Sequence, residues 1–180
     1  MTRIPFTKGH GTQNDFVVLP DPDAPVGGTG AVGGLGGVVN ASTVGAARTA
    51  GSELVRFQRA LGARYPQAKR TVVGYSYGSV VTGHAAKEDK IADDVVLVGS
   101  PGTGASHSSE LHGRIWAATN AHDPIAIATG PHGGIHGPDP TMDTFGATPL
   151  PGADGLPGDH GSYWEDPRFL RGLGQVARAN

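Results

Sequence analysis

The chain has 180 residues, a formal net charge of -2 and no cysteine. The length is enough for one domain with a buried core, and the lack of cysteine excludes disulfides, thiolate metal sites and cysteine nucleophiles. The 14 Lys and Arg residues are scattered, which argues against a nucleic-acid partner. No apolar run is long enough to cross a bilayer, and residues 1–6 carry no signal-peptide pattern. We therefore expect a cytoplasmic protein with no membrane partner.

The first part of the chain differs in pattern from the rest. Residues 3–7 and 15–19 alternate like two strands on either side of a turn. A proline-containing break and a glycine-rich stretch follow, which is typical of a linker. The pattern predicts an N-terminal hairpin segment over 1–24, a linker over 25–37 and the main domain over 38–180.

Helical periodicity then predicts a helix from Asn40 or Ser42 to about Ala63. Its apolar positions recur at helical spacing and are Val44, Ala47, Leu54, Phe57 and Leu61. Shorter helices are expected over 79–86 and 165–177. The inner face of the last helix is predicted to carry Phe169, Leu170, Leu173 and Val176.

Short runs of β-branched and apolar residues lie between these helices. Residues 70–75, 94–99 and 114–119 are expected to be buried strands, and 145–150 a short fourth one. Continuous apolar strands separated by helices and loops indicate a parallel sheet covered on both faces. The predicted fold class is therefore α/β, and the short interval from Ser100 to Gly113 leaves no room for a sizeable lid.

Ser76 is the first candidate for chemistry. It lies in the sequence Gly-Tyr-Ser-Tyr-Gly (74–78), after one predicted strand and before a helix. A tight strand-turn-helix elbow lifts a serine hydroxyl clear of the sheet, and glycines two positions away leave room for the turn. Gly-x-Ser-x-Gly also arises by chance in a glycine-rich chain, so the flanking strand and helix carry the argument. Ser76 is therefore predicted to be a nucleophile.

A serine nucleophile needs a base and a residue that orients the base. In this arrangement the acid and the histidine follow the serine in that order. Asp123 lies in the loop after the strand at 114–119, and His160 lies just ahead of the last helix. We expect His160 to accept the proton of Ser76 and Asp123 to hold the imidazole.

Other residues compete for these roles. The rival histidines are His84, His122, His132 and His136, and the rival acids are Asp139 and Asp159. Only position relative to the strands favours His160 over the other histidines, each of which could be an ordinary surface or core residue. His132 and His136 are separated by two glycines, which argues against a metal-binding helix. We predict no metal and no cofactor.

Three more residues are expected at the site. The backbone N–H of Tyr77 follows the nucleophile and is the predicted first oxyanion donor. Gly27–Gly37 is the only candidate stretch for the second donor. Tyr75 and Trp164 are predicted to line the substrate pocket, with packing around the elbow as their alternative role.

These motifs make the chain similar to a known family. From about residue 38 it resembles an actinobacterial α/β-hydrolase family of otherwise uncharacterised proteins. The similarity lies in Val-Val-Gly-Tyr-Ser-Tyr-Gly-Ser (72–79), Asp-Asp-Val-Val-Leu-Val-Gly-Ser-Pro-Gly (93–102), Trp-Ala-Ala-Thr (116–119), Asp-Pro (123–124), His-Gly-Pro-Asp-Pro (136–140) and residues 160–164. The resemblance implies a hydrolase whose triad is Ser76, Asp123 and His160.

Residues 4–19 resemble a different family, the beginning of diaminopimelate epimerase, through Phe-Thr-Lys-Gly-His-Gly-Thr-Gln-Asn-Asp-Phe (6–16). In that family the asparagine matching Asn14 helps to hold substrate. Epimerase chemistry uses two cysteines, and this chain has none, so the segment is interpreted as a borrowed hairpin. It stands where the hydrolase family normally carries its first strands. Either the hairpin covers the exposed sheet edge, or a second copy does so in a homodimer.

The leading functional hypothesis is a hydrolase of small carboxylic esters, acting through an acyl-enzyme on Ser76. A compact site without a lid favours short acyl chains. Amidase or acyltransferase chemistry on the same triad is an alternative that the sequence does not separate from esterase chemistry. A catalytically silent hydrolase fold that serves in binding or assembly is a second alternative, suggested by the replaced first strands.

Overall fold

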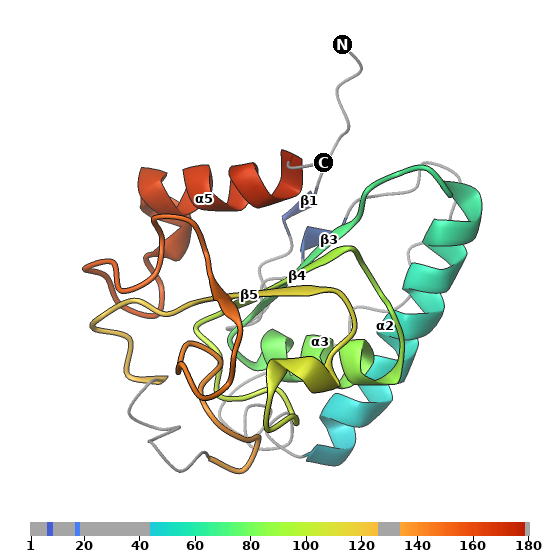
Figure 1. Ribbon diagram of the computed structural model, residues 1–180, viewed down its shortest axis with the longest axis horizontal. Coiled ribbons are helices and arrows are strands. Elements are labelled where there is room, and N and C mark those ends of the chain that lie inside the picture. The colour runs from blue at the N-terminus through green and yellow to red at the C-terminus, as the bar shows by residue number, and fades with distance from the viewer. Residues whose placement is uncertain (1–6, 9–16, 19–43, 126–133, 179–180) are drawn as a thin grey trace.

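The computed structural model describes residues 7–8, 17–18, 44–125 and 134–178. In its main part a parallel sheet lies between helices (Figure 1). The elements of this part are α2 (Val44–Arg64), β3 (Thr71–Tyr75), α3 (Tyr77–Glu88), β4 (Asp94–Val98), η1 (Ser108–Glu110), β5 (Arg114–Ala118), β6 (Thr148–Pro149), η2 (Tyr163–Glu165) and α5 (Pro167–Arg178).

Two short strands are described in the N-terminal segment. β1 (Thr7–Lys8) and β2 (Val17–Val18) pair antiparallel. The rest of the predicted hairpin over 1–24 and the whole linker over 25–37 lie outside the described residues. The division of the chain into hairpin, linker and main domain therefore stays a prediction.

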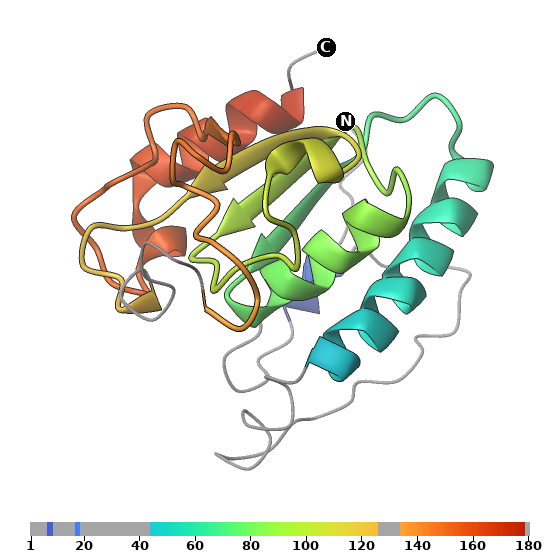
Figure 2. The same ribbon diagram turned by 60° about the horizontal axis from the view of Figure 1, so that its bottom comes forward.

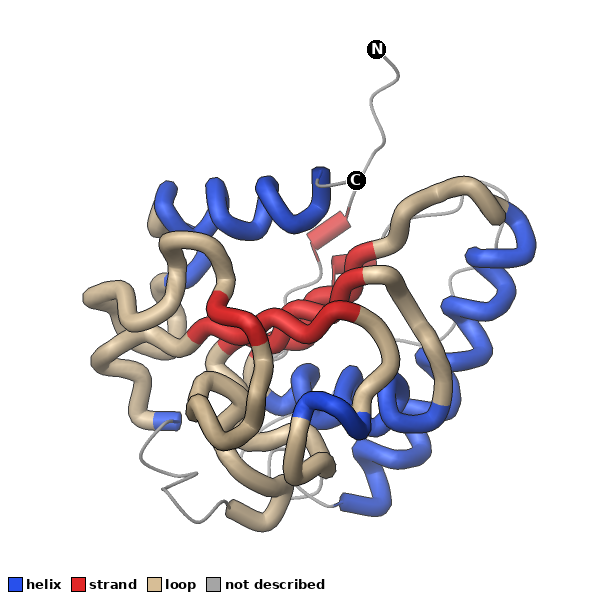
Figure 3. The backbone as a smooth tube through the Cα atoms, viewed as in Figure 1, coloured by secondary structure: helices blue, strands red, loops and turns tan. Residues whose placement is uncertain are grey.

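The main sheet has the strand order β3-β4-β5-β6, and each neighbouring pair is parallel. Figure 3 shows these strands stacked through the middle of the molecule with loops leaving both ends. Because the strands are parallel, their carboxyl ends meet at one edge, where ligands bind in open α/β sheets. Within the described residues, β3 is an edge strand of this sheet.

Helices cover both faces of the sheet. Figure 2 shows α2 and α3 together on one face and α5 on the other. The central strand β4 is wholly buried, and its alternating side chains serve the two cores. Val95 and Leu97 pack in the cluster with α3, whereas Val96 and Val98 pack in the cluster with α5. The predicted α/β architecture, with its short apolar strands, is confirmed.

The buried face of α2 differs from the predicted one. Phe57 is 50% exposed, so its predicted place on the inner stripe is wrong. The buried positions are Ala47, Gly51, Val55 and Gln58. A Cβ at Gly51 would lie 3.1–3.3 Å from atoms of α3. Small residues therefore face α3 because the two helix backbones approach closely.

The inner face of α5 also needs one correction. Phe169 and Val176 are buried as predicted, but Leu170 is 47% exposed. Gly172 is buried instead, and a Cβ on it would collide with the carbonyl of Pro151. The loop after β6 lies too close to the helix at this point for a larger side chain.

Asp94 is buried and forms an ion cluster with partly exposed cations at the amino end of the sheet. Its carboxylate accepts two hydrogen bonds from Arg114, each 2.8 Å, and one of 2.8 Å from the indole of Trp116. The Lys69 ammonium lies 3.0 Å from the same carboxylate and also donates to the carbonyl of Val176 in α5. The cluster thus links β4, β5 and the end of α5.

Candidate active site

Ser76 lies at the sharp turn between β3 and α3. Its φ is 52°, and it is the one non-glycine residue with a positive φ in the described part of the chain. Its N–H donates to the carbonyl of Val98 at 2.9 Å, which extends the β3–β4 pairing by one step. Its own carbonyl accepts from the hydroxyl of Ser79 at 2.5 Å. Neighbouring hydrogen bonds therefore hold Ser76 in a strained backbone conformation.

Gly74 explains one glycine of the motif. A Cβ at this position would lie 2.7 Å from both the Cα of Ser79 and the Oγ1 of Thr82. The first turn of α3 passes directly over Gly74, so a side chain there would force the helix away. This close approach is the physical requirement that the glycine-flanked pattern predicts.

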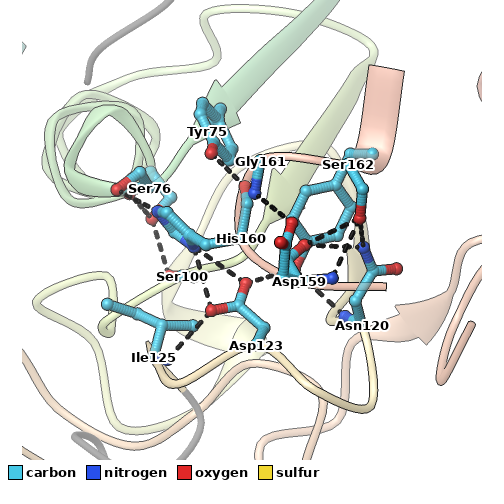
Figure 4. A network of polar contacts seen from close by, with 12 residues as sticks. Tyr75, Ser76, Ser100, Asn120, Asp123, Ile125, Asp159, His160, Gly161 and Ser162 are labelled. Atoms are coloured by element: carbon cyan, nitrogen blue, oxygen red, sulfur yellow. Dashed lines mark hydrogen bonds and ion pairs between the residues drawn. The ribbon is translucent and has the colours of Figure 1, made fainter. Parts of the chain in front are cut away.

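His160 and Asp123 approach Ser76 from two later loops (Figure 4). His160 Nε2 lies 2.8 Å from the Oγ of Ser76. On its other side, Nδ1 lies 2.8 and 2.9 Å from the two carboxylate oxygens of Asp123. Because an ionised carboxylate only accepts, Nδ1 carries the proton and Nε2 is left to accept from the serine hydroxyl. The structure thus brings the three predicted side chains together in the order serine, imidazole, carboxylate.

Asp123 is buried and held by further donors. The N–H of Ile125 donates to Oδ1 at 2.9 Å, and the phenol of Tyr163 donates to Oδ2 at 2.5 Å. Burial raises the pKa of Tyr163, and the hydrogen bond to Asp123 raises it further, so the phenol stays protonated. Tyr163 was not predicted from the sequence. The signal available was its place three residues after His160, ahead of the last helix.

Tyr75 packs against the imidazole of His160. Its ring stacks on the imidazole with 5.0 Å between ring centroids, and its phenol donates to the backbone carbonyl of His160. Trp164 meets the Tyr75 ring edge to face at 5.7 Å and also contacts Phe169. Tyr75 is buried within the core cluster, and Trp164 packs against that cluster. This arrangement agrees with the packing role, and the contact of Tyr75 and Trp164 with substrate stays a prediction.

The two oxyanion donors expected from the sequence stay predictions. Tyr77 opens α3 directly after Ser76, and its ring meets His136 edge to face at 5.7 Å. Burial raises the pKa of its phenol. Its backbone N–H stays the predicted first donor, while Gly27–Gly37 lies outside the described residues.

The rival histidines lie elsewhere in the fold. His136 is buried beside Tyr77, and its carbonyl accepts from Gly104. His84 lies on α3, and burial is the main cause that lowers its pKa. His122 is exposed, and His132 lies outside the described residues.

The rival acids serve local turns. Asp139 accepts from the N–H and the hydroxyl of Thr141, and Asp159 accepts from the N–H of Gly161. Within 44–125 and 134–178, no group of three His, Asp or Glu side chains could hold a metal ion. The predicted lack of a metal or cofactor stays a prediction. Among the helices described, none is both long and apolar enough to cross a bilayer.

Comparison with known proteins places this geometry in context. A family model described as alpha/beta hydrolase matches residues 23–132, which include Ser76 and Asp123 but not His160. An uncharacterized protein of Mycobacterium tuberculosis is 43% identical over 67 residues, which is 36% of this chain and 25% of that protein. A second one is 32% identical over 136 residues, which is 59% of this chain and 21% of that protein. No solved structure matches.

The N-terminal similarity has a separate source. The diaminopimelate epimerase of Mycobacterium leprae is 55% identical over 56 residues, covering 26% of this chain and 19% of the epimerase. Both resemblances expected from the sequence are therefore confirmed. The chain spans a quarter or less of the length of each of these relatives.

Proposed function

This chain belongs to the alpha/beta hydrolase family, and we propose that it is a serine hydrolase of small carboxylic esters. One observation carries the proposal: Ser76 Oγ lies 2.8 Å from His160 Nε2, while Nδ1 of the same ring lies 2.8 Å from Asp123. A serine hydroxyl becomes a useful nucleophile only when a positioned base accepts its proton.

In the proposed mechanism, the Oγ of Ser76 attacks the ester carbonyl carbon as its proton moves to Nε2 of His160. Asp123 stabilises the imidazolium that forms. The tetrahedral intermediate collapses, the bond to the alcohol breaks, and His160 returns the proton to the leaving alcohol. Water, deprotonated by His160, then attacks the acyl-enzyme and releases the carboxylic acid. The N–H of Tyr77 is the proposed oxyanion donor.

The proposed substrate class follows from the shape of the chain around Ser76. The segment between β4 and β5 contains only η1 (Ser108–Glu110) and no helical lid. A site with no helical lid in this segment would bury less of a long acyl chain, so short acyl groups are proposed. Amide hydrolysis and acyl transfer would use the same side chains, and the leaving group or acceptor decides between them.

A catalytically silent module is the second candidate. It is favoured by the sheet order, since within the described residues the main sheet begins at β3. A loop after an earlier strand normally supplies the second oxyanion donor. The two candidates therefore differ in whether Ser76 reacts with an ester or an ester-like inhibitor.

The test is labelling with a fluorophosphonate, together with hydrolysis of p-nitrophenyl acetate, butyrate and palmitate. We expect wild type and the surface control Ser106→Ala to be labelled and to hydrolyse the short esters faster than the palmitate. Ser76→Ala should be neither labelled nor active on any of the esters. Failure to label wild type would overturn the enzyme proposal and favour the silent module. Activity retained in Ser76→Ala would move the nucleophile elsewhere.

A further inference from the structure

Tyr163 connects to the acid of the site through a fully buried phenol. Tyr163 is 0% exposed, and its oxygen accepts the backbone N–H of Asn120 at 3.0 Å. Because that N–H can only donate, the phenol proton points to the other partner, Oδ2 of Asp123. The phenol is therefore a fixed donor to the carboxylate.

The same residues join the loop of the acid to the loop of the base. Asn120 donates its side-chain N–H to the carbonyl of Asp159 at 3.0 Å, and the N–H of His122 donates to the carbonyl of Gly158 at 3.1 Å. Figure 4 shows Asn120 and Ser162 on the side of His160 that faces away from Ser76. Polar contacts thus tie the segment after β5 to the segment that carries His160.

Open space lies beside the segment that carries His160, on the side away from the ring of Tyr75. An open surface depression of about 380 Å³ is lined by Asn120, Gly158, Ser162 and the first turns of α5, including Arg171. On that side hydrogen bonds contribute to the position of the segment. Besides His160 itself, the phenol of Tyr163 is the group of this segment that reaches the carboxylate of Asp123.

We propose that Tyr163 is a positioning residue that fixes Asp123 and sets the basicity of His160, an inference that rests on the proposed function. A donor that shares the carboxylate charge weakens the attraction between Asp123 and the imidazolium. Loss of the phenol leaves a more available negative charge beside His160. The imidazole of His160 then keeps its proton to higher pH. Because only the neutral imidazole can accept the proton of Ser76, the serine is activated over a narrower pH range.

The titratable groups that face His160 in the described residues come from four segments. They are Asp123 after β5, Tyr75 from β3, Tyr163 from η2 and Asp159, which directly precedes His160. Asp159 is exposed, and its carboxylate accepts a hydrogen bond from the N–H of Gly161. Asp123 is therefore the charged group through which a change at position 163 reaches the imidazole.

The test compares Tyr163→Phe with Tyr75→Phe, which removes the other phenol without touching Asp123. The readout is the pH dependence of fluorophosphonate labelling, and in Tyr163→Phe we expect its acid limb to move up by about 0.5–1 pH units. The plateau rate should fall about tenfold from poorer orientation. Tyr75→Phe should lower the rate and leave the limb in place.

A second readout needs no catalysis. The imidazole of His160, assigned by comparison with His160→Gln, is titrated by NMR in the resting protein, and its pKa should rise in Tyr163→Phe. An unchanged titration, or a slower reaction with an unmoved acid limb, would overturn the inference. If wild type is not labelled at all, the proposed function fails while the titration still decides the role of Tyr163.

Folding of the variant is checked by circular dichroism. If Tyr163→Phe does not fold, uniform 3-fluorotyrosine in the Tyr75→Phe background replaces it, because fluorine makes the phenol a stronger donor at nearly the same size. The pKa of His160 should then fall instead of rise. No shift in either direction would contradict the inference.

Discussion

Gly99 lies directly beneath the carboxylate of Asp123. A Cβ built on Gly99 would lie 2.9 Å from Oδ2 of Asp123 and 3.2 Å from Nδ1 of His160. Gly99 follows β4 with a φ of 51°, so the strand end turns away and leaves space for the acid and base. The glycine after this strand is therefore part of how the site is built.

We predict that Gly99→Ala lowers the rate of ester hydrolysis about 100-fold, since small displacements of catalytic groups have effects of that size. The methyl group would push Asp123 and His160 out of line. Gly152→Ala is the matched control, because Gly152 has a similar φ of 62° and nothing within 4 Å of a Cβ. Both should lose about 1 kcal/mol of stability from backbone strain, but only Gly99→Ala should lose activity. Equal activities would contradict this role of Gly99.

The two faces of α5 give a prediction about stability. Phe169 is fully buried against Tyr163 and Trp164, whereas Leu170 is 47% exposed. Phe169→Ala should lower the free energy of unfolding by about 3–5 kcal/mol, and Leu170→Ala by less than about 0.5 kcal/mol. Urea denaturation followed by circular dichroism measures both. Similar losses would mean that α5 packs in another orientation.

The buried carboxylate of Asp94 should make the free energy of unfolding depend on pH. Burial raises the pKa of this carboxyl, but hydrogen bonds from Arg114, Trp116 and Lys69 outweigh it, so the pKa lies below its ordinary value. Its contribution is therefore complete above the unfolded pKa of about 3.9 and is lost as pH falls through the folded pKa.

Asp94→Asn should lower the free energy of unfolding by about 1–3 kcal/mol at neutral pH, because it removes a buried charge that Arg114 and Lys69 pair with. The difference from wild type should shrink as the pH of the urea titration falls below about 3.9. Glu53→Gln, which removes an exposed ion pair with Arg56, should change little at any pH. A difference that stays constant into acid would show that Asp94 acts through packing alone.

The edge of β3 leads to the last prediction. Val72 and Val73 are only partly buried, and no described strand pairs with the outer edge of β3. An unpaired edge with apolar side chains favours association, so we expect a second copy of the chain to cover it. Sedimentation in the micromolar range should give twice the mass of one chain. A monomeric mass throughout that range would contradict the dimer.

Much of the fold could be predicted from local pattern. The apolar run at β4 and the strand-turn-helix around Ser76 were predictable because burial on both faces and a tight turn leave direct marks on residue type. Phe57 and Leu170 were placed wrongly because helical periodicity identifies an apolar stripe but not which neighbour covers it. Close contacts with α3 and with Pro151 select glycine at the buried positions instead.

Some residues of the candidate site could be predicted from the sequence and one could not. Chain order and strand ends were enough to choose Asp123 and His160 among several rivals. Tyr163 was not predicted because its contact with Asp123 depends on the packing of two loops, which bring the phenol to the carboxylate across 40 residues of sequence. Residue type alone carries no mark of such a contact.

Ser76 and His160 are separated by 84 residues along the chain, yet their side chains meet within hydrogen-bond distance. Closing a loop of that length costs entropy that only the finished pairing of the strands and the docking of α5 can offset. The nucleophile turn is local and can form early, whereas its base arrives last. Competence for reaction should therefore appear in one step at the end of folding, and a partly folded chain should carry an inert serine.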